Sequence, residues 1–119
     1  MTDTIQTFFD AWGDTDADQR QTKIAAAMAD PFTYADPRSD GAITSLDALT
    51  AYVGQFTDTA PCWTATVVQS DTHSGFSRAL VAFLENGEAR QHGTYFARHD
   101  ATGQLTQLVG FVGAGGLPA

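Results

Sequence analysis

The stretch Pro31-Phe32-Thr33-Tyr34-Ala35-Asp36-Pro37-Arg38-Ser39-Asp40-Gly41 places one carboxylate between an apolar run and a tight turn. Because a proline disfavours helical backbone at the residue before it, Asp36 is expected at the end of a short strand over residues 32–35. If that strand end opens into an apolar cavity, the carboxylate loses water, which suits a general base or acid. The same residues are ordinary turn formers, so a solvated turn is the alternative interpretation.

The composition is that of an ordinary globular chain of 119 residues, with 43% hydrophobic and 17% charged residues, which predicts one domain over residues 1–119. The chain has 14 Asp plus Glu against 6 Lys plus Arg, which gives a formal net charge of -8. Such a charge repels phosphate backbones and anionic lipid surfaces. We therefore expect neither nucleic acid nor membrane as a partner.

Cysteine and histidine usage points to a reducing environment and to no metal. Cys62 is the single cysteine, so an internal disulfide is excluded, and we expect a soluble, cytoplasmic protein. Residues 1–4 lack the features of a signal peptide, and no apolar run approaches the roughly 20 residues that cross a bilayer. The three histidines are dispersed without metal-ligand spacing.

The beginning of the chain shows helical periodicity. Apolar side chains recur at i, i+3, i+4 and i+7, at Ile5, Phe8, Phe9 and Trp12. This pattern predicts an amphipathic helix over residues 4–13. Its face is more aromatic than packing on a second helix requires, so we expect it to cover a sheet.

Two further helices are expected before the sheet. Asp16 is the expected N-cap of the second helix. After a short strand over residues 42–44, Thr44 or Ser45 is expected to cap a third helix whose apolar residues repeat at helical spacing. Tyr52 lies beside that apolar stripe, so its phenol could point into a cavity or out to water.

From residue 62 onward the period changes from 3.6 to 2, which indicates strands over residues 63–73, 76–85, 89–99 and 105–112. Asn86-Gly87 is the strongest short signal for a hairpin between the second and third of these strands. The strand over residues 76–85 is apolar on both sides, so we expect it to be central and covered on both faces. Three helices and such a sheet predict an α+β architecture.

Three motifs in this order carry a resemblance to a known family: Phe8-Phe9-Asp10-Ala11-Trp12; Tyr34-Ala35-Asp36-Pro37 with the later Ser45-Leu46-Asp47-Ala48-Leu49; and Gly93-Thr94-Tyr95-Phe96-Ala97 with Leu108-Val109-Gly110-Phe111. With them the chain resembles the nuclear transport factor 2-like (NTF2-like) superfamily, in particular its ketosteroid isomerase-like and SnoaL-like (polyketide cyclase-like) members. The resemblance covers nearly the whole chain. It implies a cone in which three N-terminal helices pack on a strongly curved antiparallel or mixed sheet that encloses a pocket.

The resemblance also implies roles for individual residues. In ketosteroid isomerases the aspartate before the matching proline shuttles a proton between two carbons, and Asp36 occupies that position. Those enzymes stabilise the enolate with a tyrosine on the first helix and a protonated acid on a long strand. The first position falls on Phe8, which has no proton to give, and the second falls on Tyr95, which has one. No cofactor is needed for this chemistry.

Other members of the superfamily dehydrate their substrates with an Asp-His pair and tyrosines, or open epoxides with an Asp-Arg-Asp set. The first set could be made here by Asp36 and His92 with Tyr34 or Tyr95. However, the resemblance implies that Tyr95 faces inward, and because successive strand residues alternate between the two faces, His92 would then lie on the outer face, where it would serve a dimer surface.

The charged strand residues leave further alternatives. Arg78 and Arg90 have apolar neighbours, and either could pair with Asp36, as an epoxide-opening set requires, or with Glu85. His99 lies near a hairpin end and is expected to be solvated.

We therefore expect a small-molecule pocket protein, namely an isomerase- or cyclase-type enzyme in which Asp36 transfers a proton on an apolar, carbonyl-bearing substrate. The alternatives are a non-catalytic domain that binds a hydrophobic ligand or a protein, and a dehydratase that uses Asp36 and His92. A homodimer is expected through the outer face of the sheet. The residues expected to contact the ligand are Phe8, Trp12, Tyr34, Tyr52, Phe56, Trp63, Leu108 and Gly110.

Overall fold

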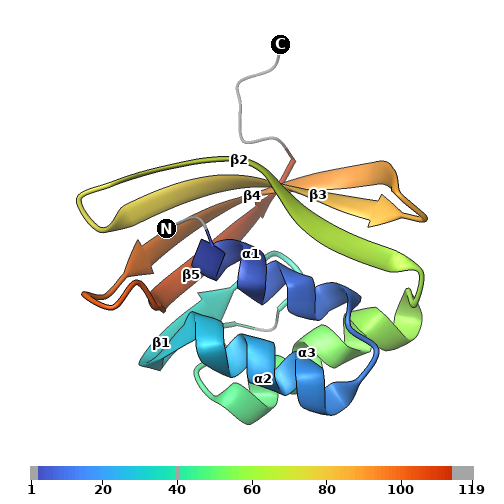
Figure 1. The fold of residues 1–119 in the computed structure, drawn as a ribbon, viewed down its shortest axis with the longest axis horizontal. Coiled ribbons are helices and arrows are strands. Elements are labelled where there is room, and N and C mark those ends of the chain that lie inside the picture. The colour runs from blue at the N-terminus through green and yellow to red at the C-terminus, as the bar shows by residue number, and fades with distance from the viewer. Residues whose placement is uncertain (1–2, 40, 114–119) are drawn as a thin grey trace.

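Three helices cover one face of a curved five-stranded sheet, as Figure 1 shows. The computed structural model describes residues 3–39 and 41–113. The elements follow the order α1 (Asp3–Asp10), η1 (Ala11–Gly13), α2 (Ala17–Ala27), β1 (Met28–Ala35), α3 (Leu46–Thr59), β2 (Trp63–His73), β3 (Phe76–Glu85), β4 (Glu88–His99) and β5 (Leu105–Val112). This arrangement confirms the predicted α+β class.

The sheet is mixed, with the strand order β1-β5-β4-β3-β2. Strand β1 runs parallel to β5, and the other neighbouring strands are antiparallel. The register of β4 with β5 sets Tyr95 directly opposite Gly110. Because β1 pairs with β5, its last residues, Tyr34 and Ala35, lie beside Leu108 and Val109 of β5. The turn that contains Asp36 follows directly after Ala35.

The predicted bounds of the long strands are confirmed, whereas three N-terminal predictions need correction. Helix α1 ends at Asp10, and the predicted last turn is a separate 3-10 helix, the tighter form often found at helix ends. Strand β1 begins at Met28, four residues before the predicted start. The predicted strand over residues 42–44 is a single bridge, in which Ile43 exchanges two backbone hydrogen bonds with Tyr34.

Two predicted helix caps and the predicted hairpin are confirmed. The side chain of Asp16 accepts hydrogen bonds from the backbone N–H groups of residues 18 and 19, and Ser45 accepts one from Ala48. In the hairpin between β3 and β4, both Asn86 and Gly87 have positive φ angles, 51° and 84°. This is the backbone of a two-residue turn that matches the twist of the strands.

Helix α1 fills the concave side of the sheet with aromatic rings. Phe8 and Phe9 have no exposed surface, and Trp12 is 5% exposed. The rings of Phe9 and Tyr95 meet edge to face, with centroids 4.7 Å apart, and Phe8 lies 5.6 Å from Tyr34. Burial of each such ring stabilises the fold by roughly 2–3 kcal/mol. As predicted, this aromatic face covers the sheet.

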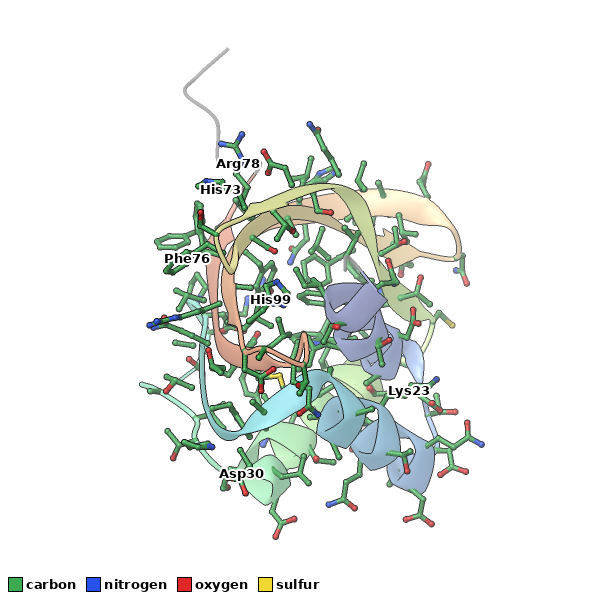
Figure 2. All side chains as sticks on the ribbon, turned by 60° about the vertical axis from the view of Figure 1, so that its left-hand side comes forward. Lys23, Asp30, His73, Phe76, Arg78 and His99 are labelled. Carbon is green, nitrogen blue, oxygen red and sulfur yellow. The ribbon has the colours of Figure 1, made fainter. Side chains whose placement is uncertain are left out.

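The outer face of the sheet is only partly covered by its own side chains. Figure 2 shows Phe76 and Arg78 pointing outward from β3, so the prediction that this strand is covered on both faces is wrong for its first half. Large apolar side chains that are about half exposed are Val68, Phe76, Phe96 and Phe111. None of the helices in residues 3–39 and 41–113 is long and apolar enough for a membrane span.

Candidate active site

A cavity of about 490 Å³ opens between helix α3, the 3-10 helix η1 and the concave side of the sheet. Its volume is in the range of pockets that bind small molecules. Its inner wall is mostly aromatic, and the residues that provide it are Trp12, Tyr52, Phe56, Trp63, Phe83 and Tyr95. Asp36 and Arg38 are the charged residues that border this cavity.

Asp36 follows directly after β1 and shapes the turn that begins there. One carboxylate oxygen, Oδ1, accepts hydrogen bonds from the backbone N–H groups of Arg38 and Ser39, both at 2.8 Å. The Ser39 hydroxyl also bonds back to the peptide of Asp36, at 3.0 Å. The side chain that makes the turn therefore also borders the cavity.

Two phenols complete the surroundings of the Asp36 carboxylate. The hydroxyl of Tyr34 lies 2.5 Å from Oδ2, and the hydroxyl of Tyr52 lies 2.6 Å from Oδ1 and 2.7 Å from Oδ2. Tyr34 belongs to β1 and has no exposed surface, whereas Tyr52 comes from α3 and is half-buried. Such short bonds to a charged acceptor are stronger than those between neutral groups, so they hold the carboxylate firmly.

The phenols around Asp36 are held in their neutral form. Burial raises the pKa of Tyr34 well above its ordinary value, and the nearby Tyr95 and Asp36 raise it further. Burial and the hydrogen bond to Asp36 raise the pKa of Tyr52. Burial and the charge of Asp36 also raise the pKa of Tyr95, which the Tyr34 hydroxyl and Arg38 oppose in part. All three hydroxyls therefore keep their protons near neutral pH, and those of Tyr34 and Tyr52 donate to Asp36.

Tyr95 reaches the cavity across two glycines. A Cβ added at Gly93 would lie 3.0 Å from Cε1 of Tyr95, and one added at Gly110 would lie 2.9 Å from its Cζ. The ring thus lies flat against β4 and β5, in space that side chains at these positions would fill. As expected, Tyr95 is on the concave side of β4.

Four of the residues expected to contact a ligand border the cavity, namely Trp12, Tyr52, Phe56 and Trp63. The other four do not. Phe8, Tyr34 and Leu108 are completely buried in the core, and Gly110 lies under the ring of Tyr95. Sequence periodicity marks a residue as inward-facing, but it does not tell the packed interior from the cavity wall.

His92 does not join Asp36. It is exposed, and it lies on the same side of β4 as Phe96 and opposite to Tyr95, as the strand period predicts. It borders the same cavity as Asp36, and no hydrogen bond within residues 3–39 and 41–113 connects the two side chains. The dehydratase alternative, in which Asp36 and His92 act on one ligand, stays a prediction.

The other charged candidates also have partners away from Asp36. Arg78 pairs with Asp71 at 2.8 Å, and Arg90 pairs with Glu85 at 3.2 Å, which was one of its two expected partners. The Asp-Arg-Asp arrangement is thus not formed. Among the described residues, no group of three or more His, Cys, Asp or Glu is placed to hold a metal ion.

His99 is not solvated as expected. Figure 2 shows it on the concave side of the sheet, where its Nε2 lies 2.6 Å from the Ser77 hydroxyl and its Nδ1 lies 3.1 Å from the carbonyl oxygen of Gly103. The strand period would have placed His99 on the same side as Tyr95 and Ala97, and this signal was available in the sequence.

Sequence reasoning missed several residues that border the cavity. Phe83 could have been found, because it lies on the same buried side of β3 as Val81 and Ala79. Gln55, Thr59 and Arg38 carried no such signal, because they lie in exposed positions of α3 and of the turn. They reach the cavity only because α3 packs beside that turn.

Comparison with solved structures identifies the class of fold. A candidate isomerase of the SnoaL-like family from Agrobacterium tumefaciens matches with a TM-score of 0.81 and 21% identity, over 92% of this chain and 94% of the other. A candidate SnoaL-like polyketide cyclase from Jannaschia matches with a TM-score of 0.71 and 14% identity, over 92% and 83%. A Catenulispora acidiphila protein with a ketosteroid isomerase-like fold, solved with trimethylamine, matches at 0.70 and 14%, over 97% and 93%.

The chain thus has the fold of the SnoaL-like and ketosteroid isomerase-like proteins within the NTF2-like class. This confirms, at the level of the fold, the resemblance seen in the sequence. No protein-family model matches the chain, and no curated protein matches it by sequence.

Proposed function

We propose that this protein is a cofactor-independent enzyme of the isomerase or cyclase type, in which Asp36 moves a proton on an apolar, carbonyl-bearing small molecule. The observation that carries the proposal is the position of Asp36, whose carboxylate borders an aromatic cavity beside neutral phenols. Proton abstraction next to a carbonyl needs a base and a donor to the oxygen within one dry site. Both kinds of group border this cavity.

The reaction would proceed in two steps, the removal of a proton by Asp36 and its return to another carbon. Asp36 takes a proton from a carbon next to the carbonyl, so that a C–H bond breaks, an O–H bond forms on the carboxylate, and an enolate results. The hydroxyl of Tyr95 donates a hydrogen bond to the enolate oxygen, where the charge develops. Asp36 then returns the proton to another carbon. The aromatic walls exclude water, which strengthens these electrostatic interactions.

The structural neighbours support this reaction class, since a candidate isomerase and a candidate polyketide cyclase share the fold. The cavity volume of about 490 Å³ is compatible with a substrate of one or more fused rings.

A direct test follows the conversion of β,γ-unsaturated cyclic ketones into their conjugated isomers by ultraviolet absorbance. We expect wild type to accelerate it, and Asp36→Asn to lower kcat by on the order of 10² to 10⁴ while affinity for the conjugated ketone persists. Asp58→Asn is the matched control, because Asp58 is exposed on α3 and does not border the cavity. Equal rates for wild type and Asp36→Asn would contradict the proposal.

A second candidate function is non-catalytic binding of a small molecule, and it is favoured by the number of donors around Asp36. Four donors surround the carboxylate, which leaves little room for a ligand proton. A carboxylate and aromatic faces suit an alkylated amine, which needs no hydrogen bond. One neighbour was solved with trimethylamine. Calorimetry with tetramethylammonium, on wild type and Asp36→Asn, would test this candidate, which requires binding that the variant loses.

We extend the proposal to the assembly and location of the protein. The exposed aromatic side chains of β3, β4 and β5 on the outer face support a homodimer that buries this face. The single cysteine, which is exposed, supports a reducing, cytoplasmic environment.

A further inference from the structure

The donors around Asp36 differ in whether a ligand could displace them. Two are backbone N–H groups of the 36–39 turn, and they cannot leave unless the turn opens. The third is the hydroxyl of Tyr34, which has no exposed surface, does not border the cavity, and packs between Phe8 and Tyr52. The fourth is the hydroxyl of Tyr52, which is half-buried and does border the cavity. Of these four donors, a ligand in the cavity can therefore displace only the hydroxyl of Tyr52.

The carboxylate of Asp36 has no vacant position while Tyr52 is in place. An ionised carboxylate offers about four lone-pair positions. The two backbone groups occupy Oδ1, Tyr34 occupies Oδ2, and the Tyr52 hydroxyl lies between both oxygens, at 2.6 and 2.7 Å. Because the turn and Tyr34 are fixed, a substrate proton has access to Asp36 only where Tyr52 now donates.

We propose that Tyr52 is an exchangeable donor, which caps Asp36 in the empty site and transfers its hydrogen bond to the carbonyl oxygen of a bound ligand. This inference rests on the proposed function and adds a catalytic residue to it. One phenol has one proton, so a bond to the ligand oxygen is a bond lost by the carboxylate. Ligand binding would thus uncover the base and bind the carbonyl in one event.

The exchange would also supply the hydrogen-bond donor that this chain lacks at Phe8, where the resemblance implies a tyrosine. Tyr52 and Tyr95 both border the cavity, Tyr95 contributes to the raised pKa of Tyr52, and Asp36 raises the pKa of both, so the two phenols lie within electrostatic reach of each other. Their hydroxyls could then share one ligand oxygen. The Tyr52 bond would strengthen as negative charge develops on that oxygen, which is the kind of interaction that lowers a barrier.

The test uses 1-tetralone as the probe and tetralin, which has the same carbon skeleton without oxygen, as its control. We expect the infrared carbonyl stretch of bound 1-tetralone to lie at lower frequency in wild type than in Tyr52→Phe. In Asp58→Asn it should equal the wild-type value, because Asp58 is exposed on α3 and does not border the cavity. An equal frequency in wild type and Tyr52→Phe, or no binding of 1-tetralone by wild type, would overturn the inference.

A measurement on wild type alone removes any dependence on folding of the variants. The chain has three tyrosines, so ¹³Cζ-tyrosine labelling gives three resonances. The Tyr52 resonance should move with 1-tetralone and stay in place with tetralin. If these shifts appear but Asp36→Asn keeps full turnover, only the proposed reaction fails. If Tyr52 does not respond but Asp36→Asn loses turnover, only the present inference fails.

Discussion

The ring of Tyr95 on β4 lies directly over Gly110 on β5, in the space that a side chain at position 110 would fill. Gly110→Ala should therefore push the ring away or separate the two strands. Inserting a carbon into such a packed site costs roughly 1–3 kcal/mol. We expect the free energy of unfolding in urea to fall by that amount.

A double-mutant cycle checks that the cost arises at this contact. In a Tyr95→Ala background, Gly110→Ala should cost much less, because the ring that it meets is absent. An equal cost in both backgrounds would show that the strain lies elsewhere in the sheet.

The phenols predict a characteristic behaviour at alkaline pH. The pKa values of Tyr34, Tyr52 and Tyr95 are all raised in the fold, and these are the only tyrosines in the sequence. A raised pKa means that the unfolded chain loses its protons first. The stabilisation is thus fully present below the unfolded pKa of roughly 10 and is lost as pH rises above it.

Near-ultraviolet absorbance of tyrosinate measures this behaviour without background from other tyrosines. The native protein should ionise at clearly higher pH than the chain unfolded in guanidinium, and stability should decline over the same alkaline range. Coincident titration curves for the native and unfolded chain would contradict the burial of these hydroxyls.

A hydrogen-bond chain at the other end of the sheet predicts a second stability effect. The Gly103 carbonyl can only accept, so His99 Nδ1 carries the proton and its Nε2 accepts from the Ser77 hydroxyl, which is in turn 2.6 Å from Thr72 Oγ1. Ser77→Ala leaves Nε2 without its partner in a site that is largely buried. We expect a loss of about 1–2 kcal/mol in the free energy of unfolding.

Arg78→Ala serves as the control for the Ser77 variant, since it changes the next residue of β3 but removes only an exposed ion pair with Asp71. Its unfolding midpoint should stay close to that of wild type. If Ser77→Ala is equally harmless, the hydrogen-bond chain does not stabilise the sheet.

The outer face of the sheet predicts self-association. Phe96 and Phe111 meet edge to face with ring centroids 5.7 Å apart, and both remain about half exposed. Sedimentation at micromolar concentration should give a dimer, and Phe96→Lys should give a monomer with an unchanged circular dichroism spectrum. Thr50→Lys on α3, away from this face, should leave the dimer intact. A wild-type monomer would remove the proposed dimer.

Local patterns in the sequence were sufficient for most of the fold. The caps at Asp16 and Ser45, the hairpin at residues 86–87 and the long strands depend on neighbouring residues, so periodicity and turn chemistry predict them. The single bridge at Ile43 was predicted as a strand, because its pairing depends on Tyr34 rather than on local sequence.

The candidate site could be predicted only in part. Asp36 was found because proline and turn residues act on the adjacent backbone, and Tyr95 was found only through the family resemblance, because strand alternation does not tell which face points inward. Phe8 and Leu108 were wrongly expected at the ligand, because the same periodicity describes a filled core and a cavity wall. His92 was left open between the two faces, and the structure shows it exposed but still bordering the cavity.

The sequence by itself determined the element order, the α+β class and the position of one acidic residue at a strand end, because these follow from interactions between near neighbours. Only the tertiary structure decided that Tyr52 from α3 meets Asp36, which lies directly after β1 and is 16 residues away in the sequence. The tertiary structure likewise decided that Tyr95 reaches the same cavity over Gly110. These contacts depend on how helices and strands pack across the concave face, and no local pattern encodes that packing.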